Sequence, residues 1–161
     1  MRKARNWSGD LSKFLKSYSY RLALTARLDS PGPAPFDQQL INEIVLWKVN
    51  RYAEISPGGL EALNGVAATK PGAHRKAKKA LLTLLEEPGI DLPLASTFLR
   101  FRNPETFQII DRHAYRAVYG KGYPLYSTSD DDEKATLYFD YLDELLQLSA
   151  SRGVRFRDLG A

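Results

Sequence analysis

The sequence has no cysteine, and only two histidines occur among its 161 residues. Without cysteine the chain forms no disulfide, offers no thiolate to a metal ion and has no cysteine nucleophile. Two histidines cannot supply a histidine-rich zinc site. We therefore expect no metal in this protein.

The sequence also lacks a long apolar run. No stretch approaches the roughly 20 apolar residues that span a bilayer. The charged start at residues 1–5 is not followed by the apolar segment of a signal peptide. We therefore expect a cytoplasmic protein without a membrane partner.

What is present is typical of a globular domain. Hydrophobic residues make up 43% and charged residues 26% of the chain, and its length suits one hydrophobic core. Lysine and arginine number 23 against 19 acidic residues, and the pI is about 9.3. This excess favours an anionic partner without identifying it. We expect one helical domain over residues 1–161.

Apolar residues recur at helical spacing along most of the chain. Segments rich in proline, glycine and serine separate these stretches. The spacing predicts helices over residues 10–28, 37–53, 60–68, 73–87, 92–102, from about 111, and from about 130 to 150. Residues 107–110 are expected to form a short extended segment, and residues 120–127 a loop. The predicted fold class is all-α, a compact multi-helix domain.

Charged residues gather in two runs of opposite sign. Residues 70–79 carry five lysines and arginines together with His74, and residues 130–133 are all acidic. Acidic side chains at a helix N-terminus stabilise the helix dipole, so we favour capping over metal binding for the acidic run. The basic run suits a phosphate backbone, although such runs also form ordinary solvated helix faces.

Two linked motifs lie between residues 88 and 118. The first, PGIDLPLASTFLRF, begins with a Pro-Gly-hydrophobic turn that is typical of a tight helical hairpin. The second, IIDRHAYRAV, follows about 20 residues later and contains Asp111, His113, Arg116 and Val118. In this order, the motifs resemble the hairpin and the catalytic-aspartate segment of the helix-hairpin-helix DNA glycosylases. The resemblance covers about residues 36–122, and we expect an N-terminal and a C-terminal helix to pack on this core.

The resemblance implies that Asp111 is catalytic. Cleavage of an N-glycosidic bond builds positive charge on the sugar, which a fixed carboxylate stabilises while it orients a water. From the residues alone, Asp111 also suits the N-cap of the following helix, and both roles stay open. Pro93 and Leu94 replace the hairpin lysine of strand-cutting members, so the implied activity is monofunctional hydrolysis of a damaged or modified base, without a cofactor.

The resemblance also implies DNA as the partner, either a duplex with an extruded base or a single strand. Candidate contacts to nucleic acid are Lys48, Arg51, Arg75, Lys76, Lys79, Gly89, Ile90, Arg112 and His113. Trp47 and Tyr52 are candidates for a base pocket, although such aromatic residues more often belong to the core. Tyr115 and Tyr119 are assigned to the core for the same reason.

Three charged residues near the motifs have competing interpretations. Arg112 either meets a phosphate or pairs with Glu105, and Arg116 is expected to be mainly structural. Asp91 stands at the hairpin's second glycine position, where a carboxylate repels phosphate. An alternative function is therefore a non-catalytic helix-hairpin-helix module that binds nucleic acid or a protein. A further one is a helical domain that binds only a protein partner.

Overall fold

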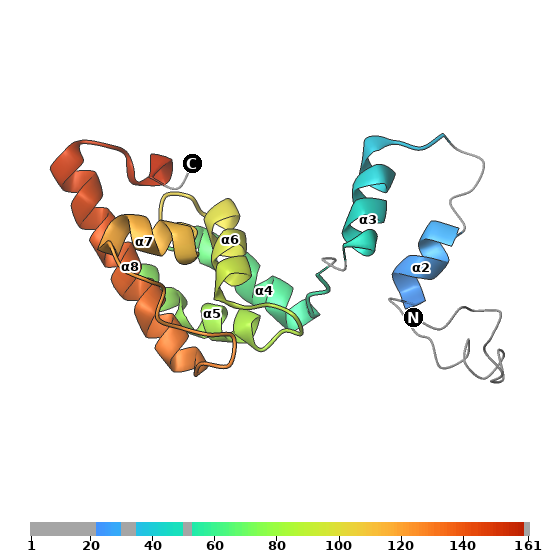
Figure 1. Ribbon diagram of the computed structural model, residues 1–161, viewed down its shortest axis with the longest axis horizontal. Coiled ribbons are helices and arrows are strands. Elements are labelled where there is room, and N and C mark those ends of the chain that lie inside the picture. Colours follow the sequence, from blue (N-terminus) through green and yellow to red (C-terminus); the bar gives the residue numbers. More distant parts are fainter. Residues whose placement is uncertain (1–21, 30–34, 50–52, 160–161) are drawn as a thin grey trace. The chain divides into compact units, whose positions relative to one another are not determined.

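The computed structural model describes residues 22–29, 35–49 and 53–159 (Figure 1). Every regular element in these ranges is a helix, which confirms the all-α class. The chain divides into two compact units, Met1–Tyr52 and Ala53–Ala161. The predicted core of residues 36–122 therefore includes parts of both units, and the prediction of a single domain stays a prediction. No helix in the described ranges is both long enough and apolar enough to cross a membrane.

The described part of the first unit contains two helices, α2 (Leu22–Asp29) and α3 (Gln38–Lys48). Asp37 caps α3 by accepting a hydrogen bond of 2.8 Å from the Leu40 amide. Trp47 Nε1 donates to Thr25 Oγ1 over 3.0 Å, and this bond links α3 to α2. This helix was predicted over residues 37–53, and α3 ends earlier than predicted, at Lys48. The first part of the helix predicted over residues 10–28 lies outside the described residues.

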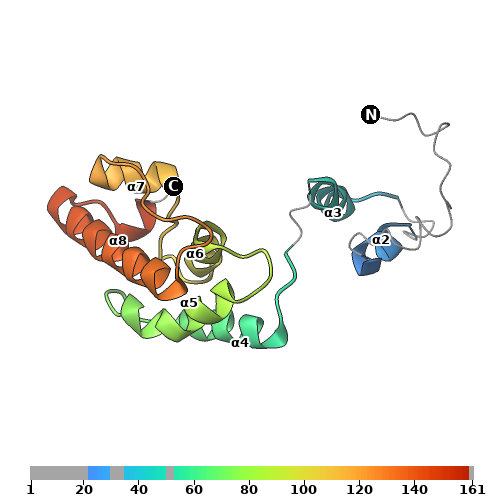
Figure 2. The same cartoon turned by 60° about the horizontal axis from the view of Figure 1, so that its bottom comes forward.

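The second unit contains the remaining helices. In chain order they are α4 (Pro57–Gly65), the 3₁₀ helices η2 (Val66–Ala68) and η3 (His74–Ala77), then α5 (Lys78–Leu85), α6 (Leu92–Arg102), α7 (Arg112–Tyr119), α8 (Asp131–Arg152) and the 3₁₀ helix η4 (Phe156–Asp158). Figure 2 shows α6 and α8 in the middle of this unit, with α7 on one side of them and α4 and α5 on the other. The two sides therefore present different surfaces.

Local sequence accounts for several of these boundaries. Ser56 Oγ accepts a hydrogen bond of 3.0 Å from the Gly59 amide, and proline is well tolerated at a first helical position, so α4 begins at Pro57. The prediction placed this start at residue 60. The helix predicted over residues 73–87 instead begins as a 3₁₀ turn, because no side chain caps it and its first residues are basic. The prediction of α6 is confirmed at both ends.

The core of the second unit holds the segment that precedes α7. Phe107 and Ile110 are fully buried in it, and each such side chain contributes about 1.5–3 kcal/mol by leaving water. The carbonyl oxygens of residues 108 and 109 accept hydrogen bonds from the hydroxyls of Tyr138 and Tyr141, over 2.9 and 3.0 Å. Both tyrosines lie on α8, so this helix fixes the position from which α7 begins.

Candidate functional site

A short hairpin joins α5 to α6 through residues 86–91. Gly89 has a φ of 79°, the left-handed conformation that favours glycine. The Ile90 side chain is buried, and its amide donates to the Glu87 carbonyl over 3.1 Å. Neither part of Ile90 is therefore open to a phosphate. Gly89 is exposed, and its predicted contact with nucleic acid stays a prediction.

Acidic groups surround the mouth of this hairpin. A depression of about 610 Å³ is lined by Gly89, Asp91, Asp130, Asp131 and Lys134, among others. The Lys134 side chain is only 7% exposed, and its Nζ lies 3.2 Å from Asp91 and 3.0 Å from Asp131. Burial alone lowers the pKa of Lys134, but hydrogen bonds to Asp131 and Asp91 outweigh this effect and raise it. Three carboxylates against one ammonium make the hairpin mouth a poor phosphate site.

Asp111 caps α7, which was one of its two predicted roles. Its Oδ1 accepts hydrogen bonds of 2.8 Å from the amides of His113 and Ala114. The side chain is half-buried, and its Oδ2 accepts no hydrogen bond from the described residues. Burial raises the pKa of Tyr141 to about 12, and the negative charge of Asp111 adds to this increase. Capping thus occupies one carboxylate oxygen and leaves the other available.

The exposed face of α7 forms a pocket with the loop that follows it. This basic-aromatic pocket, of about 640 Å³, is lined by Arg112, His113, Arg116, Gly122, Tyr123 and Tyr126. None of its three basic residues has a carboxylate partner among the described residues. Arg112 Nε instead donates to His113 Nε2 over 3.1 Å. Its predicted alternative partner, Glu105, pairs with Arg157 at 2.9 Å.

The two pocket tyrosines differ in burial. Tyr126 is 78% exposed, whereas Tyr123 is half-buried and packs edge-on against Tyr115, with ring centroids 5.5 Å apart. Burial raises the pKa of Tyr123 to about 12, so this hydroxyl stays neutral near pH 7. Tyr115 is buried, which confirms its assignment to the core. The pocket therefore combines a fixed ring, an exposed ring and arginines that have no carboxylate partner within the described ranges.

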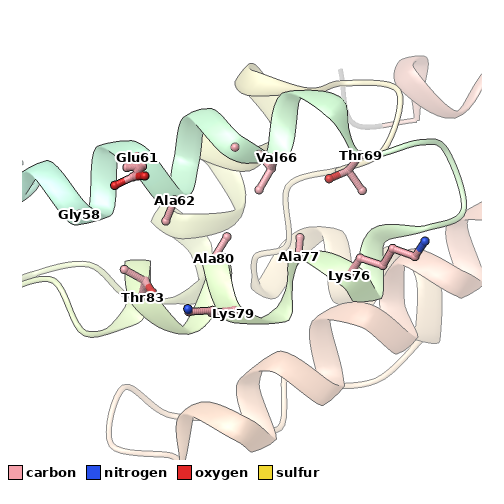
Figure 3. Close-up of a pocket in the computed structure, with 11 residues that line it drawn as sticks. Gly58, Glu61, Ala62, Val66, Thr69, Lys76, Ala77, Lys79, Ala80 and Thr83 are labelled. Atoms are coloured by element: carbon pink, nitrogen blue, oxygen red, sulfur yellow. The ribbon is translucent and has the colours of Figure 1, made fainter.

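The basic run divides between two faces of the η3–α5 segment. Arg75 Nη2 lies 2.7 Å from Asp140 and 2.5 Å from Asp143, and Lys78 Nζ lies 2.6 Å from Asp132, all on α8. Lys76 and Lys79 instead line a groove between α4 and α5 (Figure 3). Arg75 is thus already neutralised by two carboxylates, whereas Lys76 and Lys79 have no carboxylate partner among the described residues.

The predicted base pocket involves the other unit. Trp47 is half-buried on α3, where it bonds to Thr25, and Lys48 is exposed at the end of the same helix. Arg51 and Tyr52 lie outside the described residues. The roles predicted for these four residues therefore stay predictions.

Three side chains of the basic-aromatic pocket were not among the predicted contacts to nucleic acid. Arg116 was expected to be mainly structural, and Tyr123 and Tyr126 had no predicted role. Basic and aromatic residues alternate from residue 112 to residue 126, a pattern that is typical of nucleic-acid surfaces. That alternation is the signal that would have identified all three residues.

Within the described ranges, no group of three or more histidine, aspartate or glutamate side chains is arranged to hold a metal ion. Comparisons of the chain with protein-family models, with curated proteins and with solved structures find no match.

Proposed function

We propose that the chain is a nucleic-acid-binding module of helix-hairpin-helix type that contacts its ligand through the basic-aromatic pocket. One observation carries this proposal. Arg112, His113 and Arg116 are exposed without carboxylate partners among the described residues, and they share a pocket with two tyrosines.

Each component of the pocket has a role in such binding. The arginines supply forked donors to phosphate oxygens, and an exposed tyrosine ring offers a surface on which a base stacks. Stacking of this kind contributes about 1–3 kcal/mol per base. Because bases inside a duplex are already stacked, the pocket favours single strands or an extruded nucleotide.

This proposal moves the main contact away from the hairpin. The hairpin mouth carries Asp91, Asp130 and Asp131, which repel phosphate, and the Ile90 amide is already used. In the described part of the chain, no carboxylate pairs with the arginines of the α7 face. The resemblance to the hairpin motif therefore bears on the shape of the α5–α6 connection more than on phosphate binding.

Fluorescence anisotropy with a labelled single strand and a matched duplex tests this binding. We expect tighter binding of the single strand, and a large loss of affinity in Arg112→Gln/Arg116→Gln. Each phosphate contact contributes about 0.7 to the slope of log K against log salt concentration, so the double variant should reduce that slope by about 1.4.

The control is Arg152→Gln/Arg155→Gln, which changes the net charge equally at exposed positions outside the pocket. This control should bind as wild type does. Equal losses in both variants would mean that only net charge matters. Unchanged binding in the pocket variant would exclude the pocket.

Hydrolysis of an N-glycosidic bond is the second candidate function. The free Oδ2 of the half-buried Asp111, directly before Arg112 and His113 of the pocket, favours it. A water oxygen would add to the sugar C1′ as the C1′–N bond breaks, and the departing base would take up a proton. The Asp111 carboxylate would orient this water and stabilise the positive charge on the sugar.

Asp111→Asn separates this activity from capping, because asparagine caps helices as well as aspartate does. Single strands and duplexes that contain damaged or modified bases would be scanned for abasic sites. We expect product with wild type and none with Asp111→Asn, while both proteins bind the same oligonucleotides. Equal product from both proteins would exclude Asp111 from the chemistry.

A further inference from the structure

The groove between α4 and α5 is a second surface whose positive charge has no described partner. Lys76 and Lys79 are three residues apart, so they lie on one face of the η3–α5 segment. Arg75 and Lys78 lie on the other face, where carboxylates of α8 neutralise them. Lys76 and Lys79 have no carboxylate partner among the described residues, and both line the groove.

Small side chains line this groove. Figure 3 shows Ala62 and Val66 on one wall, pointing toward Ala80 and Ala77 on the other. The groove has a volume of about 560 Å³, and Gly58 and Gly65 also line it. Because most of these side chains are small, an extended chain can approach the helices closely.

A neighbouring depression of about 320 Å³ extends the groove. It shares Gly65, Thr69 and Lys76 with the groove and adds Lys70 at its far end. Asn103 holds this end in place, because its Nδ2 donates to the carbonyls of Val66 and Thr69 over 3.1 and 2.9 Å. We name the combined feature the lysine groove. Its lining includes three lysines and one acidic residue, Glu61.

The lysine groove and the basic-aromatic pocket lie on opposite sides of the second unit. The pocket is built on α7 and the loop after it, and the groove on α4 and α5. Figure 2 shows α6 and α8 between these two sides. A short strand bound at one surface therefore does not extend to the other.

We propose that the lysine groove binds the phosphate backbone of a second nucleic-acid segment, so that one chain holds two segments at once. The two-segment state rests on the proposed function of the pocket, whereas binding in the groove does not. None of the described residues that line the groove is aromatic, so these residues offer charge without base stacking. Lysine acts on phosphate as a point charge, which suits contact without sequence preference.

Stoichiometry tests this proposal. An oligothymidylate of about eight nucleotides, within the size of one single-strand site, would be titrated into protein well above its Kd. We expect two oligonucleotides per wild-type chain. One should bind to Lys76→Gln/Lys79→Gln, one to Arg112→Gln/Arg116→Gln, and none to the protein with all four changes. Arg152→Gln/Arg155→Gln should still bind two.

The salt dependence adds a second readout. In Arg112→Gln/Arg116→Gln, where only the groove binds, changing Lys76 to Gln should lower the slope of log K against log salt concentration by about 0.7. Circular dichroism of each variant checks that the exposed substitutions leave the fold intact. Sedimentation measures the oligomeric state of each complex. A monomeric wild-type complex with two oligonucleotides would place both of them on one chain.

Each other outcome has a distinct meaning. One oligonucleotide per wild-type chain, lost only in the pocket variant, would overturn the groove and leave the proposed function in place. A single oligonucleotide per wild-type chain whose binding is lost only in the groove variant would overturn the pocket and the two-segment state. No binding at either surface would overturn both proposals. An oligoglutamate that binds the groove when oligothymidylate does not would identify an acidic protein partner and overturn this proposal.

Discussion

The ammonium group of Lys134, on α8, lies 3.2 Å from the carboxylate of Asp91, which caps α6. This ion pair ties the start of the longest described helix to the hairpin. It also gives Asp91 a structural role at a position where the sequence suggested only repulsion of phosphate. Because Asp131 and the Ser127 carbonyl also accept from Lys134, both at 3.0 Å, the ammonium is held by three oxygen atoms.

Asp91→Ala removes both the helix cap and one partner of a buried ammonium. We expect the free energy of unfolding to fall by about 1–2 kcal/mol, most of it from the lost cap, because Asp91 is 42% exposed and solvent screens the ion pair. Asp91→Asn keeps the cap and should lose less. Urea denaturation measures the free energy of unfolding of both variants. Equal decreases in the two variants would contradict the expectation that most of the loss comes from the cap.

Asp111→Ala should lower the free energy of unfolding by about 1 kcal/mol, because the amides of His113 and Ala114 lose their acceptor. Asp111→Asn should unfold at nearly the wild-type urea concentration. If asparagine is as destabilising as alanine, the negative charge of Asp111 and not its cap supports α7.

Arg75→Gln should leave the affinity for oligonucleotides and its salt dependence unchanged, because Asp140 and Asp143 already neutralise this arginine. Its stability cost should stay below about 1 kcal/mol, since the ion pairs are exposed. Anisotropy titrations compare it with Lys76→Gln, which should weaken binding at the groove. A loss of affinity in Arg75→Gln would mean that Arg75 exchanges its carboxylate partners for phosphate.

The stability of the protein should depend on pH through His74. This histidine is buried against Phe139, and burial lowers its pKa below 6.5 despite the opposing effect of Asp143. The unfolded chain therefore binds a proton at a higher pH than the folded chain does. The stabilising contribution of neutral His74 is complete above about pH 6.5 and is lost as the pH falls through the range below it.

His74→Phe is the variant that isolates this effect, because it retains an aromatic ring next to Phe139 without a titratable group. Urea denaturation between pH 7.5 and pH 5, a range centred near the ordinary pKa of histidine, would compare the two proteins. We expect a steeper loss of stability on acidification in wild type. Parallel curves would show that other groups cause the loss.

Much of the local structure could be predicted from the sequence. The bounds of α6 were predicted correctly, Asp130 caps α8 as expected, and Asp111 caps α7, one of its two predicted roles. Capping depends on residues two or three positions apart, and apolar periodicity on one turn of helix, so both are visible in a short stretch of chain. The starts of α4 and α5 were misplaced because their first turns have few apolar residues to mark them.

The candidate site was harder to predict because it depends on contacts between distant residues. Arg75 and Lys76 are adjacent in one basic run, yet the structure pairs the first with α8 and directs the second to the groove. Their sequence neighbours are alike, so no local pattern distinguishes them. Likewise, Tyr126 joins Arg112 in one pocket only because the loop after α7 folds back over that helix.

The all-α class and the hairpin turn at Gly89 follow from the sequence alone, because each depends on the chemistry of neighbouring residues. Which charges remain available for a ligand depends instead on how the helices pack. Neutralisation of Arg75 and burial of Lys134 depend on where α8 packs, and the hydrophobic core sets that position through residues far apart in the chain.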